Sequence, residues 1–225
     1  MKRIGKVILF GVCLGLVLVL IQNSFQIPED LFMKGYWIGA IVVVLGALAI
    51  NIFYNLYYTA KLKKLLPLLF GGEPRRYIEG MEALIKTAKG KTLRSTLELN
   101  LAAGYMEEKD YGTAISLLEA VEPRQLRVDS ARVVRAINLC ESYFLAGQRE
   151  KAQTLYDSSR RLFAKFRTGK LYGGSIAIVD VLSEISRGEF DQAKALLDKA
   201  KSTYKEAYLQ KAYEEIGAIL EKPQE

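Results

Sequence analysis

The stretch LCESYFLAGQREKA, residues 139–152, joins the end of one helix-patterned segment to the start of another through Gly147. Apolar residues recur at three- and four-residue spacing before and after the glycine, which is typical of amphipathic helices. Glycine itself marks a break between such periodic segments. The stretch therefore predicts two helices that are connected by a tight turn.

Two other stretches align with this one without a gap, which reveals an internal repeat. They are LAAGYMEEKDYGTA at residues 101–114 and DVLSEISRGEFDQA at residues 180–193. Their final alanines and that of the first stretch lie 38 and 41 residues apart, and each is followed four residues later by a large apolar side chain: Leu118, Tyr156 and Leu197. One hairpin cannot bury its apolar face alone, so the pattern predicts stacked units that share a core.

The motif Leu-small-x2-Tyr, with alanine nine residues later and a large residue four further on, resembles the tetratricopeptide repeat (TPR) over about residues 91–203. The fold is therefore expected to be all-α, with a TPR-like α-solenoid over residues 74–225. The third unit departs from the pattern, because Asp180 and Glu184 stand where it has Leu and Tyr. Small residues are expected where the two helices of a unit cross: Ala102, Ala114, Cys140, Ala152, Val181 and Ala193.

The first quarter of the chain has a different character, that of a membrane anchor. Residues 7–28 and 35–60 contain no Asp, Glu, Lys or Arg. A bilayer core of about 30 Å needs roughly 20 such residues as a helix. Residues 1–60 are therefore expected to form a transmembrane helical hairpin with spans at about 5–27 and 36–58. No small-x-small pattern follows the first span, so we expect it to be retained and not cleaved as a signal peptide.

Basic residues set the expected orientation of the anchor. Lys2, Arg3 and Lys6 precede the first span, whereas the connecting segment holds only Lys34 beside two acids. Three lysines at residues 61–64 follow the second span. Lys and Arg are enriched on the cytoplasmic side of membrane proteins, so both termini and the repeat domain are predicted to be cytoplasmic, in a multi-pass protein of the cell membrane.

Residues 61–73 form the expected juxtamembrane linker. Proline removes a helical hydrogen bond and glycine pairs interrupt helices. Pro67 and the pair Gly71 and Gly72 are therefore predicted to break the helix before the repeat domain begins.

Composition excludes several kinds of chemistry. The chain has no histidine, and its two cysteines, Cys13 and Cys140, lie far apart. Histidine-dependent nucleophiles, general bases and zinc sites are thereby excluded. No catalytic residue, cofactor or metal site is predicted. The enzymatic alternative rests on Asp180 and Glu184, which lie four residues apart on one helix face.

Net charge argues against nucleic acid as a partner. The chain carries +7, of which residues 1–64 contribute +5 and residues 65–225 only +2. Nucleic-acid-binding domains usually carry a basic surface of their own. A basic run at residues 160–170 is interpreted as a solvated face, with contact to anionic lipid headgroups or to an acidic partner as the alternative.

The resemblance implies that the concave face binds a protein partner, either a peptide or an amphipathic helix. Family members that clamp a carboxylate use Lys and Asn at positions that are here Ala103, Glu141 and Leu182, so that mode is not expected. The alternative is that a flanking helix of the chain itself fills this groove. Helical spacing gives the expected groove residues: Leu99, Met106, Ile137, Glu141, Phe144, Ile178 and Leu182.

These observations predict a membrane-anchored, non-catalytic adaptor or scaffold that binds a protein partner at the cytoplasmic face of the membrane. The main alternative is a subunit of a membrane complex in which the transmembrane spans make the specific contacts. The short spacing Gly11-x3-Gly15 and the pair Asn51 and Asn55 are the features of the spans that could serve such contacts.

Overall fold

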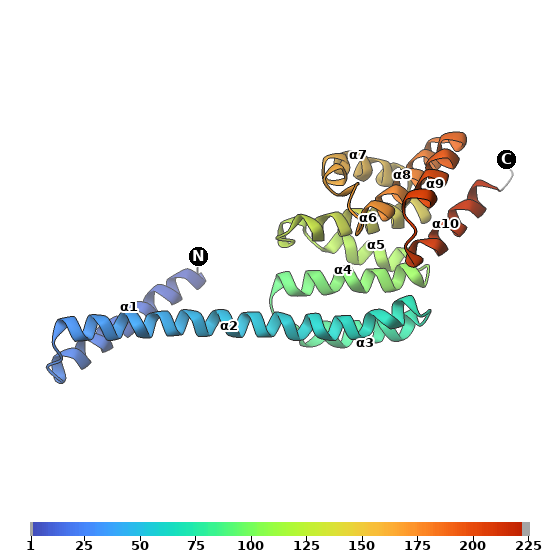
Figure 1. Cartoon of the computed structure of the whole chain (residues 1–225). Helices are drawn as coiled ribbons and strands as arrows, with labels where there is room; N and C mark the ends of the chain where they lie inside the picture. Colours follow the sequence, from blue (N-terminus) through green and yellow to red (C-terminus); the bar gives the residue numbers. More distant parts are fainter. Residues whose placement is uncertain (1, 222–225) are drawn as a thin grey trace. The chain divides into compact units, whose positions relative to one another are not determined.

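A computed structural model describes residues 2–221, with side chains from residue 11 onward (Figure 1). This part of the chain is all-α, which confirms the predicted fold class, and contains one 3-10 turn and no strand. The helices are α1 (Lys2–Ser24), α2 (Glu29–Phe70), α3 (Pro74–Thr87), α4 (Lys91–Glu107), α5 (Tyr111–Ala120), α6 (Asp129–Leu145), α7 (Arg149–Phe166), α8 (Gly173–Arg187), α9 (Phe190–Thr203) and α10 (Ala207–Leu220).

The chain divides into two units, residues 1–57 and residues 58–225, and the division falls inside α2. Among the described residues, one helix, α2, is long and apolar enough to cross a membrane. A shorter apolar segment, Gly11–Ser24, belongs to α1. The large apolar residues of both stretches are exposed in the first unit, as expected for a surface that needs an apolar environment.

The expectation that Pro67 breaks the helix is wrong. α2 continues through Pro67 and ends at Phe70, two residues before Gly72, which has a φ of +80°. A proline costs one helical hydrogen bond, but the tail of α2 is packed against α3, where the methyl groups of Leu65 lie over Gly80. Tyr58 is buried and its hydroxyl lies 3.2 Å from Thr87 Oγ1. The expected linker is therefore part of the folded second unit.

Three helical hairpins occupy the positions of the predicted repeats: α4–α5, α6–α7 and α8–α9 (Figure 1). Their turns share one geometry. Lys109, Gly147 and Gly188 all have a left-handed backbone, with φ of 60°, 73° and 81°. In each turn the next backbone N–H donates to the carbonyl five residues earlier, at 2.9, 2.9 and 3.0 Å. The three aligned turns are thus structurally equivalent.

A fourth hairpin of the same kind precedes them, and sequence comparison missed it. It is formed by the tail of α2 and α3. Gly72 takes the left-handed position, and the N–H of Glu73 donates to the Leu68 carbonyl at 2.9 Å, five residues earlier. The small residue of its helix crossing is Gly80, where a Cβ would lie 2.6 Å from Leu65 Cδ2. The array therefore begins within the long apolar helix.

The core runs through the hairpin stack as three adjoining clusters of buried side chains. The six small residues predicted at the helix crossings are all fully buried, as close packing of the paired helices requires: Ala102, Ala114, Cys140, Ala152, Val181 and Ala193. At such positions a larger side chain would force the paired helices apart. Burial also raises the pKa of the Cys140 thiol to about 12, so this cysteine is a packing residue.

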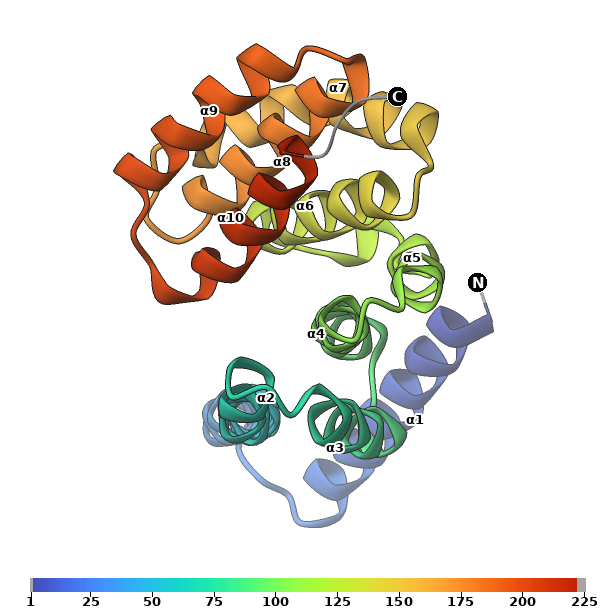
Figure 2. The ribbon, with the colours of Figure 1, turned by 90° about the vertical axis from the view of Figure 1, so that its right-hand side faces the viewer.

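The last helix, α10, follows the α9 hairpin arm and packs against α8 and α9 (Figure 2). Leu209, Tyr213 and Ile216 of α10 are buried in the same cluster as α8 and α9 residues. α6 packs in the same manner against α4 and α5. α10 thus takes the place of the first helix of a further unit and closes the end of the core.

Candidate partner-binding groove

A groove of about 640 Å³ lies between the first helices of successive hairpins and α10. Its walls come from the tail of α2, from α4, α6 and α8, and from α10. On α6 the lining residues are Val134, Asn138, Glu141 and Leu145, at spacings of four, three and four residues. This spacing is the inner stripe of one helix, because side chains three and four residues apart share a face.

The groove is apolar at one end and polar at the other. Leu66, Leu69 and Phe70 from the tail of α2 provide the apolar end, together with Tyr208, whose ring centroid lies 6.4 Å from that of Phe70. The polar end holds acidic and basic side chains from α4, the turn that follows α4, α6 and α10: Glu107, Lys109, Glu141, Lys211 and Glu215. The arrangement suits a ligand that has both apolar and charged parts.

Two ion pairs hold α10 across the polar end. Lys211 Nζ lies 2.6 Å from Glu107 Oε2, and Lys109 Nζ lies 3.0 Å from Glu215 Oε1. The first pair joins residues 104 positions apart in sequence. Exposed pairs of this kind contribute little stability individually, about 0–1 kcal/mol. They nevertheless show that a helix of the chain itself borders the groove, while a cavity remains beside it.

Glu141 is the one acidic residue that α6 contributes to this lining. It lines both the main groove and a smaller adjoining cavity of about 330 Å³. Among the described residues, no hydrogen bond or ion pair to its carboxylate is present. Burial, followed by the charges of Glu107 and Glu215, raises the pKa of Glu141 to about 7. Ionised Glu141 is therefore an uncompensated negative charge at a half-buried position of the groove.

The structure places the seven expected groove residues in different surroundings. Met106, Glu141 and Ile178 line the main groove, and Leu182 lines the smaller cavity. Leu99, Ile137 and Phe144 line neither and instead pack into the core clusters. Each first helix is packed on several sides, so apolar periodicity alone does not tell its core faces from its groove face. Residues that were not expected line the groove, such as Asn138 on α6 and Lys211 on α10.

Phe144 differs most from the expectation that it faces the groove. It is partly buried and packs against all three core clusters. Its loss would open a cavity where the clusters meet, so truncation would affect stability as well as any binding. Phe144 is therefore unsuitable as a probe of binding alone.

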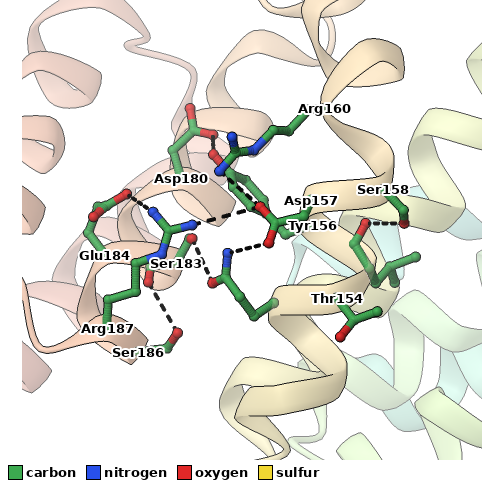
Figure 3. A network of polar contacts seen from close by, with 12 residues as sticks. Thr154, Tyr156, Asp157, Ser158, Arg160, Asp180, Ser183, Glu184, Ser186 and Arg187 are labelled. Carbon is green, nitrogen blue, oxygen red and sulfur yellow. Dashed lines mark hydrogen bonds and ion pairs between the residues drawn. The ribbon is translucent and has the colours of Figure 1, made fainter.

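Asp180 and Glu184, the departures from the repeat pattern, take part in a polar network between α7 and α8 (Figure 3). Tyr156 donates its hydroxyl proton to Asp180 Oδ1 at 2.8 Å, and Arg167 forms an ion pair with the same carboxylate. Glu184 Oε1 lies 3.0 Å from Arg187 Nη1. Between the first two hairpins the tyrosine and the acid have exchanged helices. There the tyrosine is on the first helix of a hairpin, and Tyr143 of α6 donates its hydroxyl proton to Glu119 of α5 at 2.5 Å.

The basic run at residues 160–170 is largely occupied by ion pairs of the domain. Arg160 pairs with Asp157 at 2.9 Å, and Lys165 reaches Asp129 on α6 at 3.0 Å. Arg167 pairs with Asp180. This supports the interpretation as a solvated, internally paired face.

Comparison of the chain with family models, curated proteins and solved structures finds no match. No group of three or more metal-ligating side chains occurs within the described residues.

Proposed function

We propose that the chain is a membrane-anchored, non-catalytic adaptor. Its first two apolar stretches would form a two-span anchor, and its TPR-like domain would hold a protein partner at the cytoplasmic face. The observation that carries the proposal is the groove: its walls come from the first helices of successive hairpins, and its lining contains an unpaired carboxylate at Glu141. Grooves between stacked helices are common sites for peptide or helix recognition.

The environment of the other acidic residues supports a non-catalytic role. Asp180 and Glu184 were the basis of the enzymatic alternative, and both are engaged by side chains of the domain. A catalytic acid or base must instead be able to reach a substrate.

A second candidate function places the specific contacts in the membrane. Gly11 and Gly15 on α1, and Gly39 and Gly46 on α2, have open space where a Cβ would be. Such small residues allow another transmembrane helix to approach closely. In this alternative the chain is a subunit of a membrane complex, and the spans select the partner.

Exchange of both spans for unrelated transmembrane helices separates the two functions. The chimera and the natural chain are crosslinked in membranes, solubilised and purified under the same conditions. An adaptor retains its partner after the exchange, because the groove is unchanged. Loss of the partner with an intact helical domain would favour recognition through the spans.

Topology is tested separately with reporter fusions. After Glu225, a reporter that works only in the cytoplasm is expected to be active. Near Asp30, a reporter that works only outside the cytoplasm is expected to be active. A C-terminal reporter active only outside the cytoplasm would contradict the proposed placement of the domain.

A further inference from the structure

Glu141 differs from the two acidic residues beside it in having no cationic partner. Glu107 is paired with Lys211 and Glu215 with Lys109. Across the whole lining of the groove there are four carboxylates, from Glu107, Glu141, Glu206 and Glu215, and three ammonium groups, from Lys109, Lys170 and Lys211, so one negative charge is uncompensated when all of them are ionised. A half-buried carboxylate without a partner loses part of its hydration, so a bound cation would be stabilised there.

A second orphaned carboxylate oxygen lines the same groove. Glu206 Oε2 is fully buried, and no hydrogen-bond partner for it is present in the described part of the chain. This oxygen belongs to the residue that precedes α10, so it comes from a different element than Glu141. Two independent acceptors of one groove thus lack donors from the domain.

Apolar residues share the groove lining with Glu141. Ala103 of α4, Leu145 of α6 and Ala212 of α10 line the same groove. A lysine or arginine side chain matches such surroundings, because its aliphatic stem packs on apolar surface while its charged end reaches the carboxylate. A purely hydrophilic cation would match only the carboxylate.

The size of the groove favours a peptide over a small free cation. A groove of about 640 Å³ that is lined by several helices is far larger than one ammonium group fills. The apolar end at Leu66, Leu69 and Phe70 would remain empty with a small cation. Apolar residues that flank a basic residue in a peptide would fill it.

We propose that the groove recognises a peptide segment in which one lysine or arginine, flanked by apolar residues, inserts its charged end toward Glu141. This inference rests on the proposed adaptor function and names the chemistry of the partner. It assigns Glu141 as a specificity-determining residue, with Met106 and Ile178 as apolar contacts of the segment.

The test uses the full chain in lipid nanodiscs and positional-scanning hexapeptide libraries with acetylated and amidated ends. In each library one position is fixed as Lys, Arg, Gln, Glu or Leu, and the other positions are random. Retained peptide is quantified by mass spectrometry. We expect Lys- or Arg-fixed libraries to be retained about tenfold more than Gln-fixed ones at one position, which corresponds to about 1.4 kcal/mol.

Three variants control the experiment. Glu141→Gln is expected to abolish the basic preference, whereas Glu214→Gln, on the exposed face of α10, is expected to leave it unchanged. Glu141→Lys is expected to reverse the preference toward Glu-fixed libraries. Circular dichroism melts of each variant establish that the domain is folded.

Each alternative outcome is distinct. Retention of apolar libraries with no basic preference, or with a preference that survives Glu141→Gln, would overturn the inference and leave the adaptor function standing. Retention of no library would overturn both. Spermidine that binds in an isothermal titration as tightly as the best Lys-fixed library would show a site for free cations and overturn the peptide assignment.

Discussion

Lys109 and Gly147 occupy equivalent positions in successive helical turns, with left-handed φ of 60° and 73°. For a residue other than glycine, this left-handed conformation is about 1–2 kcal/mol less favourable than the right-handed one. Lys109→Gly is therefore expected to raise the free energy of unfolding by about 1 kcal/mol, measured by urea unfolding of the chain in detergent.

Lys109→Ala is the matched control for this prediction. It removes the ion pair of Lys109 with Glu215, which is exposed and worth less than about 1 kcal/mol, but keeps the strained backbone. The expected order of stability is Gly above Lys above Ala. A glycine variant less stable than the alanine variant would contradict the equivalence of the turns.

Ala152 of α7 has no exposed surface and belongs to the core cluster that contains Leu139 and Tyr143 of α6. Ala152→Leu is expected to destabilise the domain by roughly 1–3 kcal/mol, because the added volume has no space. Ala164→Leu, on the exposed face of the same helix, is expected to change stability by less than about 0.5 kcal/mol. Equal denaturation midpoints for the two variants would show that the crossing is misplaced.

Gly173 begins α8 in close contact with backbone and side-chain atoms. A Cβ at this position would lie 2.5 Å from the Arg167 carbonyl oxygen and 2.6 Å from Tyr204 Oη. Gly173→Ala is expected to cost roughly 2–3 kcal/mol. Gly217→Ala in α10 meets open space and is expected to stabilise by about 0.5–1 kcal/mol, so thermal melts of the two variants should shift in opposite directions.

Glu141 predicts a characteristic dependence of stability on pH. Its folded-state pKa is raised to about 7 from an ordinary value of 4.5, so the folded state retains a proton that the unfolded state has lost. Below pH 4.5 the ionisation of Glu141 does not change the free energy of unfolding. This free energy falls as the pH rises from 4.5 to 7, and the full loss of stability is reached above pH 7.

Glu141→Gln should remove this cost. The variant is expected to be more stable than the natural chain by roughly 1–3 kcal/mol at pH 8 and equal to it near pH 4.5. Urea unfolding at both pH values checks this. A constant difference at the two pH values would mean that Glu141 ionises normally in the folded state.

The repeat was predictable where its signature is local. The aligned turns at Lys109, Gly147 and Gly188 and the small residues at the helix crossings follow from spacing, because a tight turn and a close crossing each tolerate few residue types. The fourth hairpin was not predictable in this way. Its aligned crossing positions hold Leu65 and Tyr77, and the necessary space comes instead from Gly80.

The groove was only partly predictable for a different physical reason. A first helix of a hairpin contacts its partner helix and the helices of neighbouring hairpins, so apolar residues occur on most of its faces. The pattern that selected Ile137 and Phe144 therefore also describes core positions. The observed stripe on α6 includes Asn138, a polar residue that an apolar pattern passes over.

Site-specific photo-crosslinking in intact membranes tests the adaptor function most directly. A photoreactive amino acid is placed in the groove at Asn138, on the outer face at Lys194 of α9, and in the apolar part of α2 at Leu45. A discrete adduct with another polypeptide is expected from Asn138 only, and this adduct is expected to be lost in the Glu141→Lys background. An adduct from Leu45 with none from Asn138 would contradict the account and place recognition in the membrane.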